Sequence, residues 1–170
     1  MRSKKTEFEK LSARVENVRK EKVSKQMVWD YFSIYIRLRY ANKKGVAKCY
    51  TCGKTFLIKD LQAGHAIMGR SNAVLFNEEI VRPQCQRCNV WLGGNLGVFV
   101  KNLIEENGIE WWEQKEKESK KVIKLDLTEL YKKYKTLVDN SLITITNSNS
   151  LPQRWKKHRE LLIKKLEVKR

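Results

Sequence analysis

Hydrophobic residues follow a helical spacing at both ends of the chain and lie in short β-prone stretches between them. Over residues 6–40, hydrophobic side chains recur at steps of three and four, which is the spacing of one face of an α-helix. The same spacing returns in four later segments, at residues 95–108, 109–121, 126–139 and 151–170. We therefore expect long helices on both sides of a segment that is mostly not helical.

The β-prone stretches occupy residues 46–84 and are separated by turn residues. The stretches AKCYTCGKTFLI, LQAGHAI and IVRPQC each predict a strand, and the first and last also contain cysteines. The chain as a whole is thus predicted to be an α+β protein. We expect a small β-containing module that is flanked by long basic α-helices.

Changes in pattern and composition divide the chain into five predicted segments. They are a basic helical N-terminal arm (residues 1–44), the β-containing module (residues 45–108), a helical C-terminal extension (residues 109–140), a linker of small polar residues (residues 141–150) and a basic C-terminal helix (residues 151–170). No stretch reaches the roughly 18 apolar residues that a membrane-spanning helix needs, and the N-terminus lacks an apolar signal region. We therefore expect a soluble, cytoplasmic protein without a membrane partner.

Positive charge is concentrated at the two ends of the chain, and the formal net charge is +17. Residues 1–48 hold 14 Lys and Arg against 5 Asp and Glu, and residues 151–170 hold 8 against 2, whereas residues 101–150 are balanced. Because Lys and Arg neutralise phosphates and release counterions, this excess favours DNA as the partner over a set of merely solvated helix faces. The candidate phosphate contacts are Arg70, Arg82, Arg87, Arg154, Lys156 and Lys157.

All four cysteines lie in two C-x-x-C pairs, Cys49 with Cys52 and Cys85 with Cys88. Two disulfides would require an oxidising compartment, which nothing else in the sequence indicates, and two redox motifs would require two separate redox sites. Four thiolates instead complete the tetrahedral ligand set of a structural Zn²⁺ ion, with no position left open for chemistry. The sequence therefore predicts a zinc site that stabilises the fold.

His65 lies between the two Cys pairs, on a predicted strand, and Asn89 directly follows the last cysteine. This order of histidine strand, loop, second strand, Cys pair and Asn resembles that of the HNH nucleases. The resemblance implies a zinc-braced, treble-clef-like ββα-metal unit with one catalytic divalent cation, Mg²⁺ or Mn²⁺. It also implies that His65 is the general base and that Asn89 ligates the cation. From the residues alone, two alternatives remain. His65 could be a strand residue whose hydrogen bonds are made within the fold, and Asn89 could only cap a helix.

A narrower resemblance rests on the stretches LQAGHAIMGR and LFNEEIVRPQCQRCNVWLGGN. They contain a Gly-His, a Phe-Asn-Glu, a Gln-Cys-x-x-Cys-Asn and a Gly-Asn in this order. Over residues 45–108 the sequence is similar to the phage NinG/Rap recombination endonucleases. This resemblance implies a structure-selective DNA endonuclease that cleaves branched recombination intermediates such as Holliday junctions, D-loops and flaps.

Two positions depart from the HNH pattern. Ile80 stands where the middle Asn of the pattern would steady the histidine loop, and Asn77 is the residue expected to substitute for it. Gly64 stands where the residue before the base often ligates the cation. Amide and carboxylate oxygens elsewhere in the module suit a hard cation. The candidate ligands of the cation are Asn89, Asn95 and Glu78.

Two other functions also fit the sequence. One is a non-catalytic zinc DNA-binding protein that assists recombination, which the residues at positions 64 and 80 favour. The other is an HNH homing or restriction-type endonuclease on linear duplex DNA, although the sequence contains no clear recognition helix. A symmetric junction would suit a homodimer, which is a further hypothesis about partners.

Overall fold

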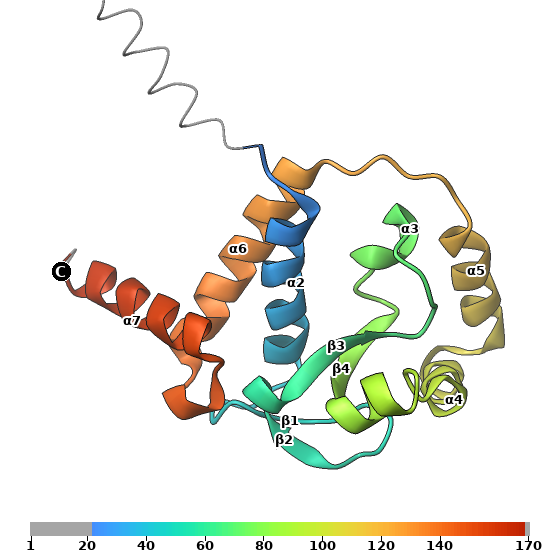
Figure 1. Ribbon diagram of the computed structural model, residues 1–170, viewed down its shortest axis with the longest axis horizontal. Coiled ribbons are helices and arrows are strands. Elements are labelled where there is room, and N and C mark those ends of the chain that lie inside the picture. The colour runs from blue at the N-terminus through green and yellow to red at the C-terminus, as the bar shows by residue number, and fades with distance from the viewer. Residues whose placement is uncertain (1–21, 169–170) are drawn as a thin grey trace, which may run out of the picture.

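The computed structural model describes residues 22–168, which form helices packed around two short antiparallel strand pairs (Figure 1). The elements in chain order are α2 (Lys25–Arg39), β1 (Val46–Lys48), β2 (Thr55–Leu57), η1 (Ile58–Asp60), β3 (Leu61–His65), α3 (Asn72–Leu75), β4 (Val81–Cys85), η2 (Arg87–Trp91), α4 (Leu96–Asn107), α5 (Ile109–Ser119), α6 (Leu127–Thr144), η3 (Ser148–Ser150) and α7 (Gln153–Glu167). Here η1 and η3 are 3₁₀ turns and η2 is a π-helical turn. The predicted α+β class is confirmed.

The helix α2 contributes many of the side chains that fill the core. It begins after Ser24, whose hydroxyl accepts a hydrogen bond from the Met27 amide at 3.2 Å and so caps the first turn. Val28, Phe32 and Ile36 follow at steps of four and are completely buried. This helix packs against α6 and also against β3 and β4 (Figure 1). It therefore joins the C-terminal helices to the strands.

The β3–β4 pair brings together the two stretches that carry the candidate site. Its antiparallel register pairs Leu61 with Cys85 at one end and His65 with Val81 at the other. Residues 66–80 connect the strands and include the short helix α3. The strands therefore fix the histidine at the mouth of this loop, while the cysteine end of β4 lies at the opposite end of the pair.

Helix boundaries agree with the sequence pattern at several points and differ at one. The helix α4 ends at the C-cap Gly108, and α6 begins at the N-cap Asp126, whose carboxylate accepts hydrogen bonds from two amides of the first turn. The helix α6 runs on to Thr144, inside the predicted linker, because Leu142 is completely buried and continues the core-facing stripe. Residues 6–21 of the predicted N-terminal helix lie outside the described residues.

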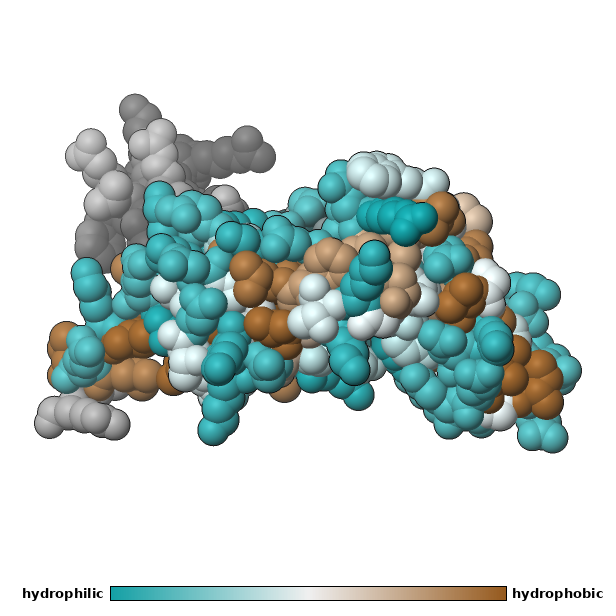
Figure 2. Space-filling model, turned by 90° about the horizontal axis from the view of Figure 1, so that it is seen from below, coloured by the Kyte–Doolittle hydropathy of each residue, from teal (hydrophilic) through white to brown (hydrophobic). Residues whose placement is uncertain are grey.

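The surface is mostly hydrophilic, with separate hydrophobic patches on the face that Figure 2 shows. One patch lies at the left end, where α7 is found in Figure 1, and Leu161 and Leu166 of this helix are 59% and 46% exposed. Trp155, near the start of α7, is buried against the core. Among residues 22–168, every helix is too short or too polar to cross a membrane.

Candidate functional site

The four cysteines converge from two turns of the chain. Cys49 and Cys52 belong to the turn between β1 and β2, whereas Cys85 ends β4 and Cys88 lies in η2. Their Sγ atoms all lie within 4.8 Å of one another, and all four thiols are free. Sulfurs that bind one zinc ion tetrahedrally at about 2.3 Å lie about 3.8 Å apart, so the arrangement fits the ion. The predicted metal-binding cluster is confirmed, and four thiolates are the ligand set of structural zinc.

Hydrogen bonds prepare Cys49 to act as a thiolate ligand. Its Sγ accepts a hydrogen bond from the Cys85 amide at 3.3 Å and lies 3.5 Å from the Thr51 hydroxyl. Burial raises the pKa of Cys49, but these bonds and others from nearby amides outweigh burial and lower the pKa to about 6. The deprotonated form that binds a metal is therefore accessible at neutral pH.

His65 is the last residue of β3, and two contacts hold its ring. One face stacks on Trp29 of α2, with ring centroids 5.5 Å apart and planes inclined by 15°. Its Nε2 lies 3.2 Å from the carbonyl oxygen of Leu75 at the end of α3. Because a carbonyl only accepts, Nε2 carries the hydrogen of this bond, and in the neutral ring Nδ1 keeps a free lone pair. The ring therefore presents one basic nitrogen.

The surroundings of His65 favour the neutral ring. Burial lowers its pKa below the usual 6.5, the hydrogen bond to Leu75 raises it, and the charge of Arg70 lowers it further. The ring is therefore mostly neutral at pH 7 and takes up a proton only at lower pH. Arg70 is exposed and lies over the Trp29 ring at 5.7 Å from its centroid, so a cationic side chain borders the histidine.

The position before the histidine has no room for a side chain. A Cβ added at Gly64 would lie 1.9 Å from Oε1 of Gln84 and 3.0 Å from Oδ1 of Asn89. Gln84 is completely buried, and its amide nitrogen donates to the Gly94 carbonyl at 2.7 Å. Its Oε1 is buried and has no hydrogen-bond partner among the described residues. Two amide oxygens therefore approach the space that a ligand at position 64 would occupy.

Asn89 lies on the turn η2, next to β3. Its amide nitrogen donates to Oε1 of Gln62 at 2.6 Å. Both side chains line a hollow of about 260 Å³ that is also lined by Trp29. Trp29 in turn stacks on His65, so the structure brings the histidine and Asn89 to one region.

The Gly94–Asn95 turn folds back on η2. The Gly94 amide donates to the Asn89 carbonyl at 3.0 Å. Asn95 is the N-cap residue of α4 and has a φ of 47°, a left-handed conformation that Asn tolerates better than most residues. Its side chain makes no capping hydrogen bond. Asn95, and not Asn89, thus occupies the cap position of α4, and its amide oxygen is not used by the helix end.

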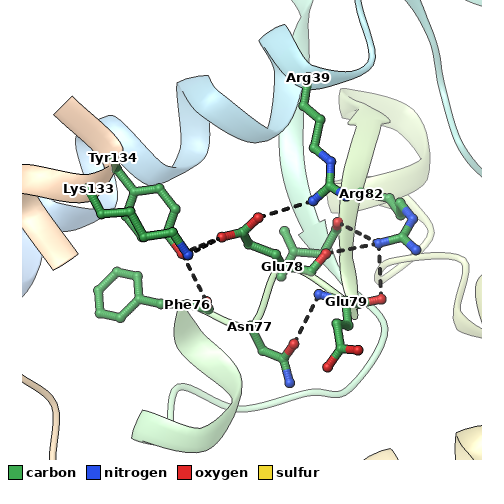
Figure 3. Close-up of polar contacts among 9 residues, drawn as sticks. Arg39, Phe76, Asn77, Glu78, Glu79, Arg82, Lys133 and Tyr134 are labelled. Carbon is green, nitrogen blue, oxygen red and sulfur yellow. Dashed lines mark hydrogen bonds and ion pairs between the residues drawn. The ribbon is translucent and has the colours of Figure 1, made fainter. Parts of the chain in front are cut away.

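Asn77 and Glu78 are engaged within the loop that joins β3 and β4 (Figure 3). Asn77 Oδ1 accepts from the backbone amide two residues further on at 3.0 Å. The Glu78 carboxylate accepts from Lys133 at 2.7 Å and from the Tyr134 hydroxyl at 3.0 Å, and it pairs with Arg39 at 3.1 Å. Burial raises the pKa of Glu78, but these donors and positive charges outweigh burial and lower it. The ionised carboxylate is thus satisfied by protein groups, which argues against a cation ligand.

The candidate phosphate contacts of the β-containing module differ in accessibility. Arg70 and Arg87 are exposed. Arg82 is only 8% exposed, and its guanidinium donates to three backbone carbonyls of residues 78–81. Arg82 therefore braces the loop from inside, and this burial argues against a direct contact with phosphate.

The basic residues of α7 lie away from the histidine. In Figure 1, α6 and α2 separate this helix from β3 and β4. Arg154 pairs with Asp30 of α2, and Lys156 donates to Asn149 at 3.1 Å, whereas Lys157 is exposed. The structure therefore does not bring the C-terminal candidates together with those of the β-containing module.

A comparison with protein families identifies the relatives of this chain. The family model described as Bacteriophage Lambda NinG protein matches residues 1–141. The chain belongs to the NinG family. Comparisons with curated proteins and with solved structures give no match. Membership in the NinG family suggests a function related to phage recombination.

The NinG match is wider than the stretch on which the sequence resemblance rested. It includes the strands, the cysteines and His65, and it continues through α5 into α6. It ends before α7, so the family does not account for the basic C-terminal helix.

Three residues that border the candidate site were not singled out from the sequence. Trp29 and Tyr134 fall in long helices, and their spacing there indicates only a core-facing position. Gln84 was part of the Gln-Cys-x-x-Cys-Asn motif, so its place directly before a metal ligand was a usable signal. Its unpartnered oxygen became visible only in the folded chain.

Proposed function

We propose that this NinG-family protein is a divalent-cation-dependent endonuclease that cleaves branched DNA recombination intermediates. The observation that carries the proposal is the setting of His65: its Nε2 is bonded to the Leu75 carbonyl, its Nδ1 has no hydrogen-bond partner within residues 22–168, and burial lowers the pKa of the ring. A ring in this state is a competent general base near neutral pH. Family membership supplies the link to recombination.

In the proposed reaction, His65 Nδ1 accepts a proton from a water molecule as the water oxygen attacks a DNA phosphorus. A bond forms between this oxygen and phosphorus, and the bond from phosphorus to one sugar oxygen breaks. The sugar oxygen leaves with the electron pair and takes up a proton from solvent. Stacking on Trp29 and the bond to Leu75 keep the basic nitrogen in one orientation during the reaction. Arg70, whose guanidinium lies over the Trp29 ring, would bind a phosphate oxygen.

The amide oxygens beside Gly64 suit a hard divalent cation. Asn89 Oδ1 and the unpartnered Gln84 Oε1 both approach the space next to this glycine. Oxygen atoms are the ligands that Mg²⁺ and Mn²⁺ prefer, so we assign Asn89 and Gln84 to hold the cation, with Asn95 in the adjoining turn. When bound, the cation would neutralise charge on the phosphate and on the leaving oxygen.

Charge supports DNA as the substrate class. The chain has a net charge of +17, and Arg70, Arg87 and Lys157 are exposed. Contacts to phosphates hold DNA without reading its bases, which suits an enzyme that selects a branched structure and not a sequence. Salt-sensitive binding of junctions and flaps follows from this proposal.

The test compares a four-way junction, a flap and a linear duplex of matched sequence, with Mg²⁺, with Mn²⁺ or without added divalent cation. We expect cation-dependent nicking of the branched substrates. His65→Ala should lower kcat/KM by at least about 100-fold, the effect of losing a general base, and should leave DNA binding intact. The matched control is His158→Ala, because His158 lies on α7 and hydrogen-bonds to Asp139 at 2.7 Å. Undiminished cleavage by His65→Ala would exclude His65 as the base.

The pH dependence gives the same experiment a second readout. Because burial lowers the pKa of His65, cleavage should be constant near pH 7 and fall only as the pH drops below 6.5. Protonation then removes the lone pair of Nδ1. An acid limb of the pH profile centred above pH 7 would contradict the assignment of the half-buried His65 as the base.

A non-catalytic DNA-binding role is the second candidate, and one observation favours it. Lys133, Tyr134 and Arg39 all bind the carboxylate of Glu78. The acidic residue that was predicted to ligate the cation therefore stabilises the fold instead. Binding of branched DNA without nicking under any cation would support this role. Equal nicking of the linear duplex would instead support a homing or restriction-type nuclease.

A further inference from the structure

We propose that Tyr134 and Glu78 are positioning residues that hold the loop of residues 66–80, so that the Leu75 carbonyl fixes the tautomer and orientation of His65. The catalytic meaning of this inference rests on the proposed function, whereas its structural content does not. The inference assigns control of the His65 orientation partly to Tyr134 of α6. This helix lies outside the segment of residues 45–108 that carries the cysteines.

The Leu75 carbonyl is available because α3 is a short helix that ends at this residue. The last carbonyls of a helix have no partner within the helix, so they accept hydrogen bonds from elsewhere. His65 Nε2, at 3.2 Å, is such a donor. The orientation of the imidazole therefore depends on where the loop places Leu75.

Tyr134 reaches the loop from the core side. The residue is 1% exposed, and its ring packs edge-on against Phe32 at 5.0 Å between centroids. Its hydroxyl donates to the Glu78 carboxylate at 3.0 Å and lies 3.5 Å from the carbonyl oxygen of Phe76, the residue next to Leu75. The buried Tyr134 hydroxyl thus contacts the residue next to Leu75, whose carbonyl accepts the hydrogen bond from His65.

Glu78 ties the same part of the loop to two helices (Figure 3). Lys133 of α6 and Arg39 of α2 both bind its carboxylate, at 2.7 Å and 3.1 Å. From the other side, Arg82 donates to the backbone carbonyls of Glu78 and Glu79 at 3.1 Å and 3.0 Å. The loop is therefore held through both its side chains and its backbone.

The side chain of Ile80 is apolar and buried, so it offers the loop no hydrogen bond. Its carbonyl accepts from the Ala66 amide at 2.9 Å, which closes the base of the loop but does not reach the helix α3. On the N-terminal side of Leu75, Asn72 of α3 accepts a hydrogen bond from Lys25 and donates one to the Ile123 carbonyl. On its C-terminal side, the Tyr134 hydroxyl contacts Phe76 and Glu78 from outside the loop. Removing the Tyr134 hydroxyl should let the loop shift and weaken the bond from His65.

The test measures the His65 tautomer by ¹⁵N NMR of the full chain, in which His65 and His158 are the only histidines. We expect the Nε2–H form in the wild type and a mixture of tautomers in Tyr134→Phe and in Glu78→Gln. The matched control is Tyr131→Phe, on the same helix, because the Tyr131 ring packs edge-on against Tyr31 of α2. The control should keep the wild-type signals of His65.

Cleavage assays of the same variants separate this inference from the proposed function. Tyr134→Phe should lower kcat by about tenfold with little change in KM, the usual scale for a group that orients a functional side chain. A shifted tautomer in a chain whose wild type does not cleave DNA would leave the inference standing and reject the nuclease. An unchanged tautomer in folded Tyr134→Phe would overturn the inference, and Glu78→Gln decides in the same way if Tyr134→Phe does not fold.

Discussion

At the scale of single residues, His65 owes its chemical state to atoms that lie far away in the sequence. The Trp29 ring and the Leu75 carbonyl hold the imidazole, and burial keeps it neutral. The histidine itself was identified from its place between the Cys pairs. Neither contact was predicted, because a helical pattern says which face a residue occupies and not which ring it meets.

A substitution at Gly64 tests how tightly the region next to His65 is packed. Gly64→Ala would place a methyl group 1.9 Å from the side chain of buried Gln84, and we expect it to lower the free energy of unfolding by about 1–3 kcal/mol. The matched control is Gly97→Ala in α4, where an added Cβ meets nothing within 4 Å. This change should be neutral or stabilise by about 0.5 kcal/mol.

Urea denaturation of both variants measures the difference. Equal stabilities of Gly64→Ala and the wild type would mean that Gln84 moves aside without cost. In that case the two amide oxygens would not be held in place at position 64, and their assignment to a cation would lose its support.

At the scale of elements, the strands and most helix ends were predictable from local signals. The Cys pairs, the Gly108 C-cap and the Asp126 N-cap lie where their chemistry requires them. The end of α6 was not predictable, because residues 140–144 have a polar, linker-like composition. Burial of Leu142 against the core outweighs this weak local preference and extends the helix to Thr144.

The four cysteines connect the β1–β2 turn to the end of β4, so removing a bound metal ion should affect the stability of the whole module. We expect one zinc ion per chain and, after its removal, a large loss of stability. Structural zinc contributes on the order of 10 kcal/mol in small zinc domains. Thermal melting followed by circular dichroism, with metal content measured by atomic emission, checks this expectation.

Zinc added back should restore the melting temperature, and Mg²⁺ should not, because thiolates prefer the softer ion. Cys52→Ser should reproduce the metal-free protein. A metal-free chain with an unchanged melting temperature would show that the four thiols contribute nothing to stability through a bound ion.

At the scale of the whole molecule, positive charge is distributed over surfaces that face different directions. Arg70 borders the histidine, whereas α7 carries its Lys and Arg on the far side of α6 and α2 (Figure 1). Under the proposed function, a DNA that contacts both regions extends over much of the protein, as a branched substrate would.

Lys157→Ala tests whether α7 contributes to binding. Under the proposed function, we expect the slope of log Kd against log salt concentration to fall by about 1, as for the loss of one phosphate contact. Protein stability should stay within about 0.5 kcal/mol, because Lys157 is an exposed surface residue. Fluorescence anisotropy with a labelled junction measures the slope.

The matched control is Gln153→Ala, an exposed and uncharged position on the same helix. It should leave the slope unchanged. If Lys157→Ala also leaves the slope unchanged, the DNA does not reach this part of α7.

The sequence by itself determined the α+β class, the metal-binding cysteines and the resemblance to the NinG family. These features depend on residue types at short, fixed spacings, which any local reading of the chain can detect. Only the tertiary structure decided what Gly64, Glu78 and Arg82 do. Their roles depend on the neighbours that folding brings to them: a buried amide oxygen, three donors from two helices, and the carbonyls of a loop. The contacts of Gly64 and Glu78 join residues that are distant in the sequence, and those of Arg82 depend on the fold of a loop, so no local pattern encodes them.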